Sequence, residues 1–261
     1  MNILDELANY SRLRVETDKQ KISLEEMKIA AQNSKLGNGE KFISALKRPN
    51  LSFICEVKKA SPSKGIIAEN FPYLEIAKEY EAAGADCISC LTEPKYFFGS
   101  DEIFTEIRAA VEIPMLRKDF TVDEYQIYQA KAIGADAILL ICAILTTAEI
   151  EKFLTICESL KICAIVETHD EVEIKSARSA GASIIGVNNR NLKNFTVDFE
   201  TAAKLRDLIP AEKIYIAESG VKTPADISTL KKIGADAVLI GETLMRAENK
   251  IEMLKSLRAA Q

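Results

Sequence analysis

The amino-acid sequence predicts a closed (β/α)8 barrel, in which eight parallel strands alternate with helices around a packed centre. Beyond residue 50, short apolar runs alternate with amphipathic segments of helical period, such as 73–83, 122–133 and 225–233. Strict alternation of this kind indicates a parallel sheet. Eight such units in about 210 residues match the usual size of this barrel. The runs are 51–58, 86–91, 113–118, 136–141, 162–167, 183–188, 213–218 and 236–240.

A phrase that recurs before every second run supports the same fold. AGADCIS, IGADAIL, AGASIIG and IGADAVL each place a glycine between a helix and a strand, at positions 84, 134, 181 and 234. A helix commonly ends next to a residue in the left-handed conformation, which glycine adopts readily. We therefore interpret the chain as four copies of a double βα unit. The competing fold is an open doubly wound sheet, but the G-x-G-x-x-G fingerprint that such sheets often use is missing.

The residues before the first run predict three helices, over Ile3 to about Val15, Leu24 to about Asn33, and Glu40 to about Lys47. Ser23, followed by Glu26 three residues later, is typical of a capping box at the start of the second helix. We therefore expect a helical extension over residues 1–50 and the barrel over 51–261, together in a single domain.

Composition restricts the class of protein. The chain of 261 residues is 48 % hydrophobic and 28 % charged, which allows a sizeable core. Its net charge of −5 argues against a nucleic-acid partner. No apolar run approaches the roughly 20 residues of a membrane span, and the N-terminus lacks the apolar centre of a signal peptide. We expect a cytoplasmic protein with no membrane partner.

Neither the cysteines nor the histidine predicts a metal site or a catalytic nucleophile. Six cysteines in a chain of this length do not suggest a disulfide framework, and we expect them to be reduced. Cys87 and Cys90 form a C-x-x-C, but on a strand they point to opposite faces. The one histidine, His169, has no serine or cysteine in a recognisable catalytic setting beside it. We interpret it as a solvated loop residue.

Polar side chains gather where the strands end, and chemistry in such barrels lies at the C-terminal ends of the strands. The first strand ends with Glu56 and Lys58, which share one face because side chains alternate along a strand. Later strands end with Lys118, Glu167, Asn188, Arg190 and Glu218. Lysine and glutamate would then perform the proton transfers, because a crowded barrel mouth can shift the pKa of both toward neutral pH.

Two loops indicate a phosphate site. Ser219 and Gly220 follow the seventh strand, and Gly241 and Glu242 follow the eighth. Loops after these strands often bind phosphate through backbone N–H groups and a short helix N-terminus. The Glu242 carboxylate would repel a phosphate, so we expect it to point away while its N–H contributes. Cations for an anionic substrate lie in or beside the βα loops at Lys58, Lys59, Lys64, Lys118, Arg190 and Lys193.

These motifs resemble one family. EVKKASPSKG, LTEPKYFFGS, LRKDF, IVETHDE, GVNNRNL, AESGV and IGETLM, in order over residues 56 to 246, are similar to the βα motifs of the indole-3-glycerol phosphate synthases of tryptophan biosynthesis. EVKKASPSKG and RKDF are specific to that family. The resemblance implies a monofunctional carboxy-lyase. Such an enzyme converts 1-(o-carboxyphenylamino)-1-deoxyribulose 5-phosphate to indole-3-glycerol phosphate, with loss of carbon dioxide and water and without cofactor or metal. On an association with other enzymes of that pathway the sequence is silent.

The resemblance also implies roles for individual residues. Lys118 resembles the general acid that protonates the ribulose carbonyl as the ring carbon attacks it. Glu167 resembles the carboxylate near the substrate amine, and Lys58 a lysine that holds the anionic substrate and acts in dehydration. The other matches are polar residues around the ribulose hydroxyls (Glu56, Asn188, Glu218), substrate-binding residues (Ser61, Arg190), aromatics of the anthranilate pocket (Phe97, Phe120) and the phosphate loop (Ser219, Gly220, Gly241, Glu242). At Glu242 the family often has a small hydroxyl residue, which puts a side-chain contact to phosphate in doubt.

Three alternatives stay open at this stage. An isomerase of an aminated ribulose phosphate would need an inward cysteine on the first strand, whereas Cys55 has the opposite parity to Glu56. A Schiff-base aldolase would use a desolvated lysine, Lys118 or Lys58, as its nucleophile. A catalytically silent barrel would bind a phosphorylated ligand without forming an indole.

Overall fold

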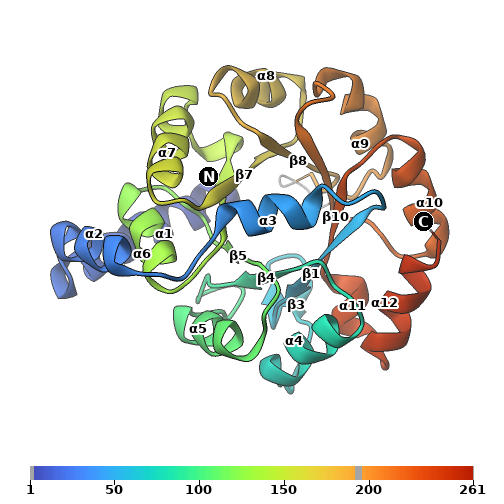
Figure 1. The fold of residues 1–261 in the computed structure, drawn as a ribbon, viewed down its shortest axis with the longest axis horizontal. Coiled ribbons are helices and arrows are strands. Elements are labelled where there is room, and N and C mark those ends of the chain that lie inside the picture. Colours follow the sequence, from blue (N-terminus) through green and yellow to red (C-terminus); the bar gives the residue numbers. More distant parts are fainter. Residues whose placement is uncertain (1–2, 192–195, 261) are drawn as a thin grey trace.

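Eight parallel strands close into a barrel in the computed structural model, which describes residues 3–191 and 196–260 (Figure 1). The strands are β1 (Ser52–Val57), β4 (Cys87–Leu91), β5 (Met115–Lys118), β6 (Ala137–Ile141), β7 (Cys163–Thr168), β8 (Ile184–Asn188), β9 (Ile214–Glu218) and β10 (Ala237–Ile240). Each strand pairs with its neighbours in sequence, and β1 pairs with β10 to close the ring. The predicted barrel is therefore confirmed, with one strand in each of the eight runs. The loop after β1 adds a small antiparallel ribbon of β2 (Ala60–Ser61) and β3 (Gly65–Ile66).

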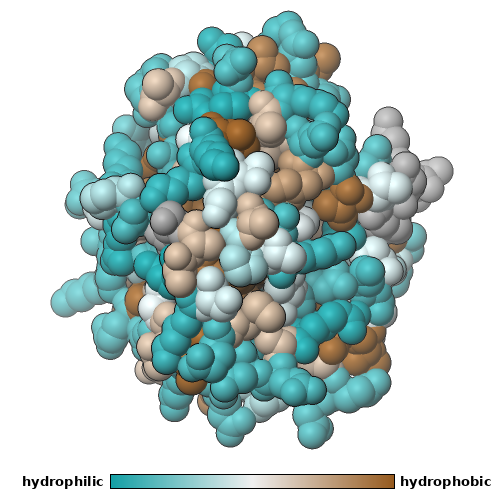
Figure 2. Space-filling model, turned by 90° about the vertical axis from the view of Figure 1, so that its right-hand side faces the viewer, coloured by the Kyte–Doolittle hydropathy of each residue, from teal (hydrophilic) through white to brown (hydrophobic). Residues whose placement is uncertain are grey.

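Helices surround the strands (Figure 1). They are α4 (Tyr73–Ala82), α5 (Asp101–Ala110), α6 (Glu124–Ala132), α7 (Thr147–Ser159), α8 (Glu171–Ser179), α9 (Glu200–Leu205), α10 (Pro224–Lys232), α11 (Glu242–Arg246) and α12 (Lys250–Arg258), with short 3-10 turns η1 (Cys142–Ile144) and η2 (Arg206–Leu208). The face on the right of Figure 1 is mainly hydrophilic, with apolar side chains in separate patches (Figure 2). The apolar faces of the helices therefore pack inward, against the barrel.

The recurring phrase has a structural basis. Gly84, Gly134, Gly181 and Gly234 have φ angles of 90°, 90°, 87° and 73°, as expected for left-handed residues that end helices. The aspartate two residues later, in three of the four copies, accepts a backbone N–H from the preceding strand of the barrel. These bonds join Asp86 to Phe53, Asp136 to Met115 and Asp236 to Tyr215, at 2.8, 2.7 and 2.7 Å. The phrase thus fixes the start of one strand against the start of the next.

The N-terminal extension covers both ends of the barrel. It consists of α1 (Ile3–Lys21), α2 (Leu24–Asn33), which has the expected capping box of Ser23 and Glu26, and α3 (Gly39–Leu46). Helix α1 is longer than expected, because no helix-breaking residue occurs before Ser23. Helix α3 crosses the barrel in Figure 1 and buries Phe42 and Leu46 in its interior. The division of the chain at residue 50 within one domain stays a prediction, which this burial supports.

Side chains fill the barrel in layers, as is usual for this fold. Alternate strands β1, β5, β7 and β9 contribute a purely apolar set of inward side chains, Ile54, Leu116, Ile165 and Ile216. Two residues further along the same strands, the inward positions are Glu56, Lys118, Glu167 and Glu218. A layer of charged residues therefore lies on a floor of hydrocarbon. Cys87 joins the interior cluster and Cys90 the outer one, so the C-x-x-C faces two ways, as expected.

Candidate active site

A pocket of about 750 Å³ opens at the C-terminal ends of the strands. This volume lies in the range of small-molecule sites. Every residue that the sequence assigned to catalysis or substrate binding lines it: Glu56, Lys58, Ser61, Phe97, Lys118, Phe120, Glu167, Asn188, Arg190, Glu218, Ser219, Gly220, Gly241 and Glu242. Of the other expected cations, Lys64 lines the pocket and Lys59 does not, and Lys193 lies outside the described residues. The pocket is apolar near α1 and β4 and charged where β1, β5, β7, β8 and β9 end.

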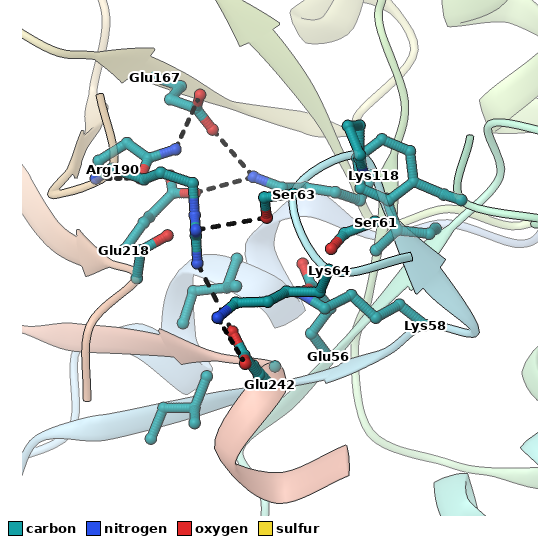
Figure 3. Close-up of a pocket in the computed structure, with 18 of the residues that line it drawn as sticks. Glu56, Lys58, Ser61, Ser63, Lys64, Lys118, Glu167, Arg190, Glu218 and Glu242 are labelled. Atoms are coloured by element: carbon teal, nitrogen blue, oxygen red, sulfur yellow. Dashed lines mark hydrogen bonds and ion pairs between the residues drawn. The ribbon is translucent and has the colours of Figure 1, made fainter. Parts of the chain in front are cut away.

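Lys118 lies at the centre of the charged side, between two carboxylates (Figure 3). Its Nζ is 2.9 Å from Oε2 of Glu167 and 2.8 Å from Oε2 of Glu218. Asn188 donates to the other oxygen of Glu167 at 3.2 Å. Because all of these groups end strands, their backbones are held by the parallel ladder. Lys118 thus contacts two of the three glutamates that the sequence placed at the strand ends, Glu167 and Glu218.

Burial and charge shift the pKa values of this cluster in different directions. Burial alone would raise the pKa of Glu167, but the charges of Lys118 and His169 outweigh it and lower the pKa to about 2. Burial raises the pKa of Glu218 to about 7, against the charge of Lys118 and with that of Glu167. Burial would lower the pKa of Lys118, but the two carboxylates raise it. One lysine thus lies between two carboxyls whose pKa values are shifted in opposite directions, and the titrations of the three groups are linked.

Glu56 and Lys58 form a second ion pair, with 2.5 Å between Oε1 and Nζ, as their shared face on β1 predicted. Two glycines make room for the buried carboxylates. A Cβ atom at Gly241 would collide with the Glu56 carboxylate and the Lys58 ammonium, and one at Gly186 with the Glu218 carboxylate. Sequence reasoning missed Gly186. The available signal was a glycine inside a strand, which often marks a close approach.

Cations and one carboxylate meet on the side of β8 and β10 (Figure 3). Glu242, at the start of α11, lies 3.6 Å from Nζ of Lys64 on the loop after β1 and 3.7 Å from Nη2 of Arg190 after β8. Arg190 also lies 3.4 Å from Oγ of Ser63. The expectation that the Glu242 carboxylate points away is therefore wrong. It faces both cations across the rim of the pocket.

Phe97 and Phe120 form the apolar side, with ring centroids 6.1 Å apart. The carboxylate of Glu93 orders the loop before Phe97 by accepting its N–H at 3.0 Å. Helix α1 completes this wall with Leu4 and Leu7, which sequence reasoning also missed. Only their helical spacing, one turn apart, hinted at a shared buried face.

Helix α1 is tied to the strand that bears Lys118. Arg14 forms an ion pair of 2.7 Å with Asp119, which is buried directly after Lys118. Ser11 donates to the carbonyl of Phe120 at 2.6 Å. On the outer side of β5, Arg117 binds Asp101 at 2.8 Å. Arg117 and Asp119, which flank Lys118 in the RKDF motif, share one face and pair with each other at 3.3 Å. Together they tie the strand of Lys118 to α1 and α5.

His169 is not a solvated loop residue, and that interpretation is wrong. Its side chain is 16 % exposed and lies between two carboxylates, with Nδ1 3.0 Å from Glu173 and Nε2 3.5 Å from Glu167. The alternation of side chains places it on the same face of the chain as Glu167. The sequence signal was this two-residue spacing, together with Glu173 four residues later, in the first turn of α8.

Within 3–191 and 196–260, no group of three or more histidine, cysteine, aspartate or glutamate side chains is arranged to hold a metal ion. None of the helices in those ranges combines the length and the apolar character that a membrane crossing requires.

The fold and this site together define a class of protein: a (β/α)8 barrel with a lysine–glutamate acid–base cluster and a cationic rim for an anionic ligand. Comparison with known proteins gives the family. The family model described as indole-3-glycerol phosphate synthase matches residues 4–257. The chain belongs to the indole-3-glycerol phosphate synthase family.

Individual relatives agree with this. The chain is 52 % identical over 260 residues to the indole-3-glycerol phosphate synthase of Ruminiclostridium cellulolyticum, covering 99 % of both chains. It is 50 % identical to that of Endomicrobium trichonymphae, covering 98 % of this chain and 99 % of the relative. A solved structure, thiamine phosphate pyrophosphorylase from Pyrococcus furiosus, has a TM-score of 0.62 at 17 % identity, over 80 % of this chain and 95 % of that one. This last likeness concerns the fold alone.

Proposed function

We propose that this pocket performs the reaction of the family. The substrate is 1-(o-carboxyphenylamino)-1-deoxyribulose 5-phosphate, which is closed to indole-3-glycerol phosphate with loss of carbon dioxide and water. The observation that supports this best is the position of Lys118, between Glu167 and Glu218 at 2.9 and 2.8 Å over an apolar floor. An acid of raised pKa stays protonated until a developing oxyanion takes its proton.

The two sides of the pocket suit the two ends of this substrate. Phe97 and Phe120 offer an apolar slot for the aromatic ring. Lys64, Arg190 and the backbone N–H groups that follow β9 and β10 lie on the other side, where a phosphate would gain from their charge and hydrogen bonds. The ribulose carbonyl would then lie between them, within reach of Lys118. Lys58, paired with Glu56, is the second cation at this level of the barrel.

In the proposed order of events, Lys118 donates its proton to the carbonyl oxygen while the ring carbon attacks the carbonyl carbon. The carboxylate on the attacking ring carbon then leaves as carbon dioxide, which restores the aromaticity of the ring. Glu167, whose pKa is lowered to about 2, is ionised and can accept a proton near the substrate amine. Lys58 assists the loss of water. Glu218 and Asn188 hold Lys118 and Glu167 in place.

The alternatives have less support. Cys55, which an isomerase would need inside the barrel, packs in the outer apolar cluster, and burial raises the pKa of its thiol. A Schiff-base aldolase needs a neutral lysine, whereas the raised pKa of Lys118 keeps it charged. A silent binding barrel would not need an acid and a base in contact with one cavity. A cytoplasmic location remains a prediction from the sequence.

The test is turnover of the synthetic substrate, followed by the fluorescence of the indole product. We expect turnover without added metal or cofactor, and competitive inhibition by inorganic phosphate. Tight binding without an indole product would instead support the silent barrel. Gly220→Asp, which places a carboxylate in the loop after β9, should raise KM. An unchanged KM would place the phosphate elsewhere.

A further inference from the structure

His169 is partly buried between the carboxylate of Glu167 and that of Glu173, which lies nearer the surface. It follows β7, and its Nδ1 shares a hydrogen bond of 3.0 Å with Oε2 of Glu173 on α8. The same Glu173 oxygen accepts the backbone N–H of His169 at 2.8 Å. The other ring nitrogen, Nε2, is buried without a hydrogen-bond partner among the described residues and lies 3.5 Å from Oε1 of Glu167. The ring is thus held by Glu173 with its second nitrogen directed at Glu167.

The charged surroundings of this ring are mostly anionic. The groups that act on its charge are Glu173 on α8, Glu167 on β7 and Glu218 on β9, and Lys118 on β5 lies behind Glu167. Asp170 follows it in the chain, and Cys142 on η1 binds the carbonyl of Glu173. Cys142 stays a neutral thiol, because burial raises its pKa to about 12. Burial would lower the pKa of His169, but the Glu173 hydrogen bond and the charge of Glu167 outweigh it and raise this pKa. The site therefore favours the imidazolium.

The proposed reaction creates a need for this cation. While Lys118 is charged, it holds Glu167 ionised across 2.9 Å. When Lys118 gives its proton to the substrate carbonyl, it becomes a neutral amine, and Glu167 loses its nearest cation inside a buried site. Burial without a nearby cation raises the pKa of a carboxylate, so that it takes up a proton more readily. Once protonated, it can no longer accept a proton from the substrate. A second cation that takes no part in the proton transfer would keep Glu167 ionised.

We propose that His169 is a positioning residue that, as an imidazolium held by Glu173, keeps Glu167 ionised after Lys118 has given up its proton. The inference deepens the proposed function and rests on it. His169 touches no substrate in this assignment and acts only through Glu167. The consequence is that turnover needs protonated His169, so kcat falls as the pH rises through the pKa of this residue.

The first experiment measures that pKa directly. The chain has one histidine, so in protein without an affinity tag a single imidazole resonance reports it by NMR. We expect a pKa above the ordinary value of about 6.5. Glu173→Gln, which keeps the shape but removes the charge, should lower it. Glu171→Gln is the matched control, because Glu171 lies in the same turn of α8 but pairs with Lys175 at 2.6 Å. A wild-type pKa below 6.5, or equal effects of the two variants, would overturn the proposal.

The second experiment is the pH dependence of turnover in the wild type, His169→Asn and Glu173→Gln. The alkaline limb of kcat should follow the NMR pKa in the wild type and move to lower pH in Glu173→Gln. In His169→Asn, kcat should be about tenfold lower with KM nearly unchanged. This is the loss expected when the pKa of Glu167, beside a neutral Lys118 and without the imidazolium, lies roughly one unit above the assay pH. The pH profile of His169→Asn should have no alkaline limb in the pH range where His169 titrates in the wild type. An alkaline limb that is the same in all three proteins would refute the idea, and if His169→Asn fails to fold, Glu173→Gln decides.

The outcomes separate this inference from the function on which it rests. If the wild type forms no indole product, the proposed function fails, whatever the histidine pKa. If the wild type turns over but its histidine titrates below 6.5, only the role of His169 fails.

Discussion

The two ends of the barrel both bury carboxylates, but they give them different partners. At the N-terminal end, Asp136 accepts from Arg108 at 3.1 Å and from the N–H groups of Asn38 and Met115 at 2.7 Å each. Asp86 is bound as completely, by Arg48, Arg258 and the N–H of Phe53. At the C-terminal end, Glu167 and Glu218 share one lysine. Oε1 of Glu218 has no hydrogen-bond partner among the described residues.

This difference separates stability from chemistry. A carboxylate that accepts from an arginine and from backbone N–H groups at fixed distances has its hydrogen bonds satisfied and ties together the segments that donate to it. Two carboxyls beside one lysine cannot both be satisfied, so their pKa values separate, to about 2 for Glu167 and about 7 for Glu218. The N-terminal carboxylates therefore stabilise the fold, whereas the C-terminal carboxyls have the unequal pKa values that the proposed proton transfers require.

Removing Lys118 should have the largest effect on activity. Lys118→Ala deletes the proposed acid, and the loss of a general acid typically costs 10²–10⁴-fold in rate. We expect kcat to fall by that factor while substrate affinity stays within roughly tenfold. Steady-state kinetics with the synthetic substrate measure both. A variant that keeps more than a third of the wild-type kcat would show that Lys118 is not the acid.

Asp136→Asn should have the opposite profile, with a large loss of stability and little loss of activity. It leaves the partly buried guanidinium of Arg108 without its charge partner and an amide where the Met115 N–H needs an acceptor. Breaking a buried pair in this way costs on the order of 3 kcal/mol of the free energy of unfolding. Chemical denaturation measures it, and kcat per folded molecule should stay within about twofold. A kcat that falls with stability would show that the two ends are not separate.

Glu218→Gln should stabilise the protein at alkaline pH, which inverts the result expected for Asp136. The folded-state pKa of Glu218 is raised to about 7. A raised pKa gives stability that is complete below the unfolded-state value and is lost as the pH rises through the folded one. The wild type therefore loses this contribution between about pH 4.5 and 7. The variant has no such loss, so its free energy of unfolding should exceed that of the wild type by on the order of 1–3 kcal/mol at pH 8, and by less at pH 5.

The contribution of Glu167 to stability changes with pH in the opposite direction. Its pKa is lowered to about 2, so its contribution is present above pH 4.5 and is lost as the pH falls toward 2. Unfolding curves of the wild type and Glu218→Gln from pH 3 to 8 separate the two contributions. A variant that is less stable than the wild type at pH 8 would show that Glu218 is as well satisfied as the aspartates.

The sequence predicted those features that depend on residues close together in the chain, and it predicted contacts between distant segments less well. The barrel, the parity of Glu56 and Lys58 and the inward direction of Lys118 follow from the two-residue period of strands, which is local. The pairing of Lys118 with Glu218 joins strands that lie a hundred residues apart in the chain. The sequence alone therefore could not decide which of the glutamates at the strand ends lie next to Lys118. His169 was misjudged because its neighbour Glu173 lies on the next element, and polar loop residues are usually exposed. The space behind Gly186 exists only once β8 and β9 lie side by side.

The carboxylate with the loosest contacts at the C-terminal end is Glu242, and its removal should have the smallest effect. It lies 3.2 to 3.7 Å from Arg246, Lys64 and Arg190 and is partly exposed. A phosphate that binds these cations must compete with it, and exposed ion pairs are worth about 0.2–1 kcal/mol. Glu242→Gln should therefore lower KM by roughly two- to fivefold at low salt and by less at high salt, where such charges are screened. Glu252→Gln, which removes a charge from an exposed pair with Lys255 outside the pocket, is the matched control. A KM that rises in Glu242→Gln would mean that the carboxylate holds Lys64 and Arg190 in place for the substrate and does not compete with it.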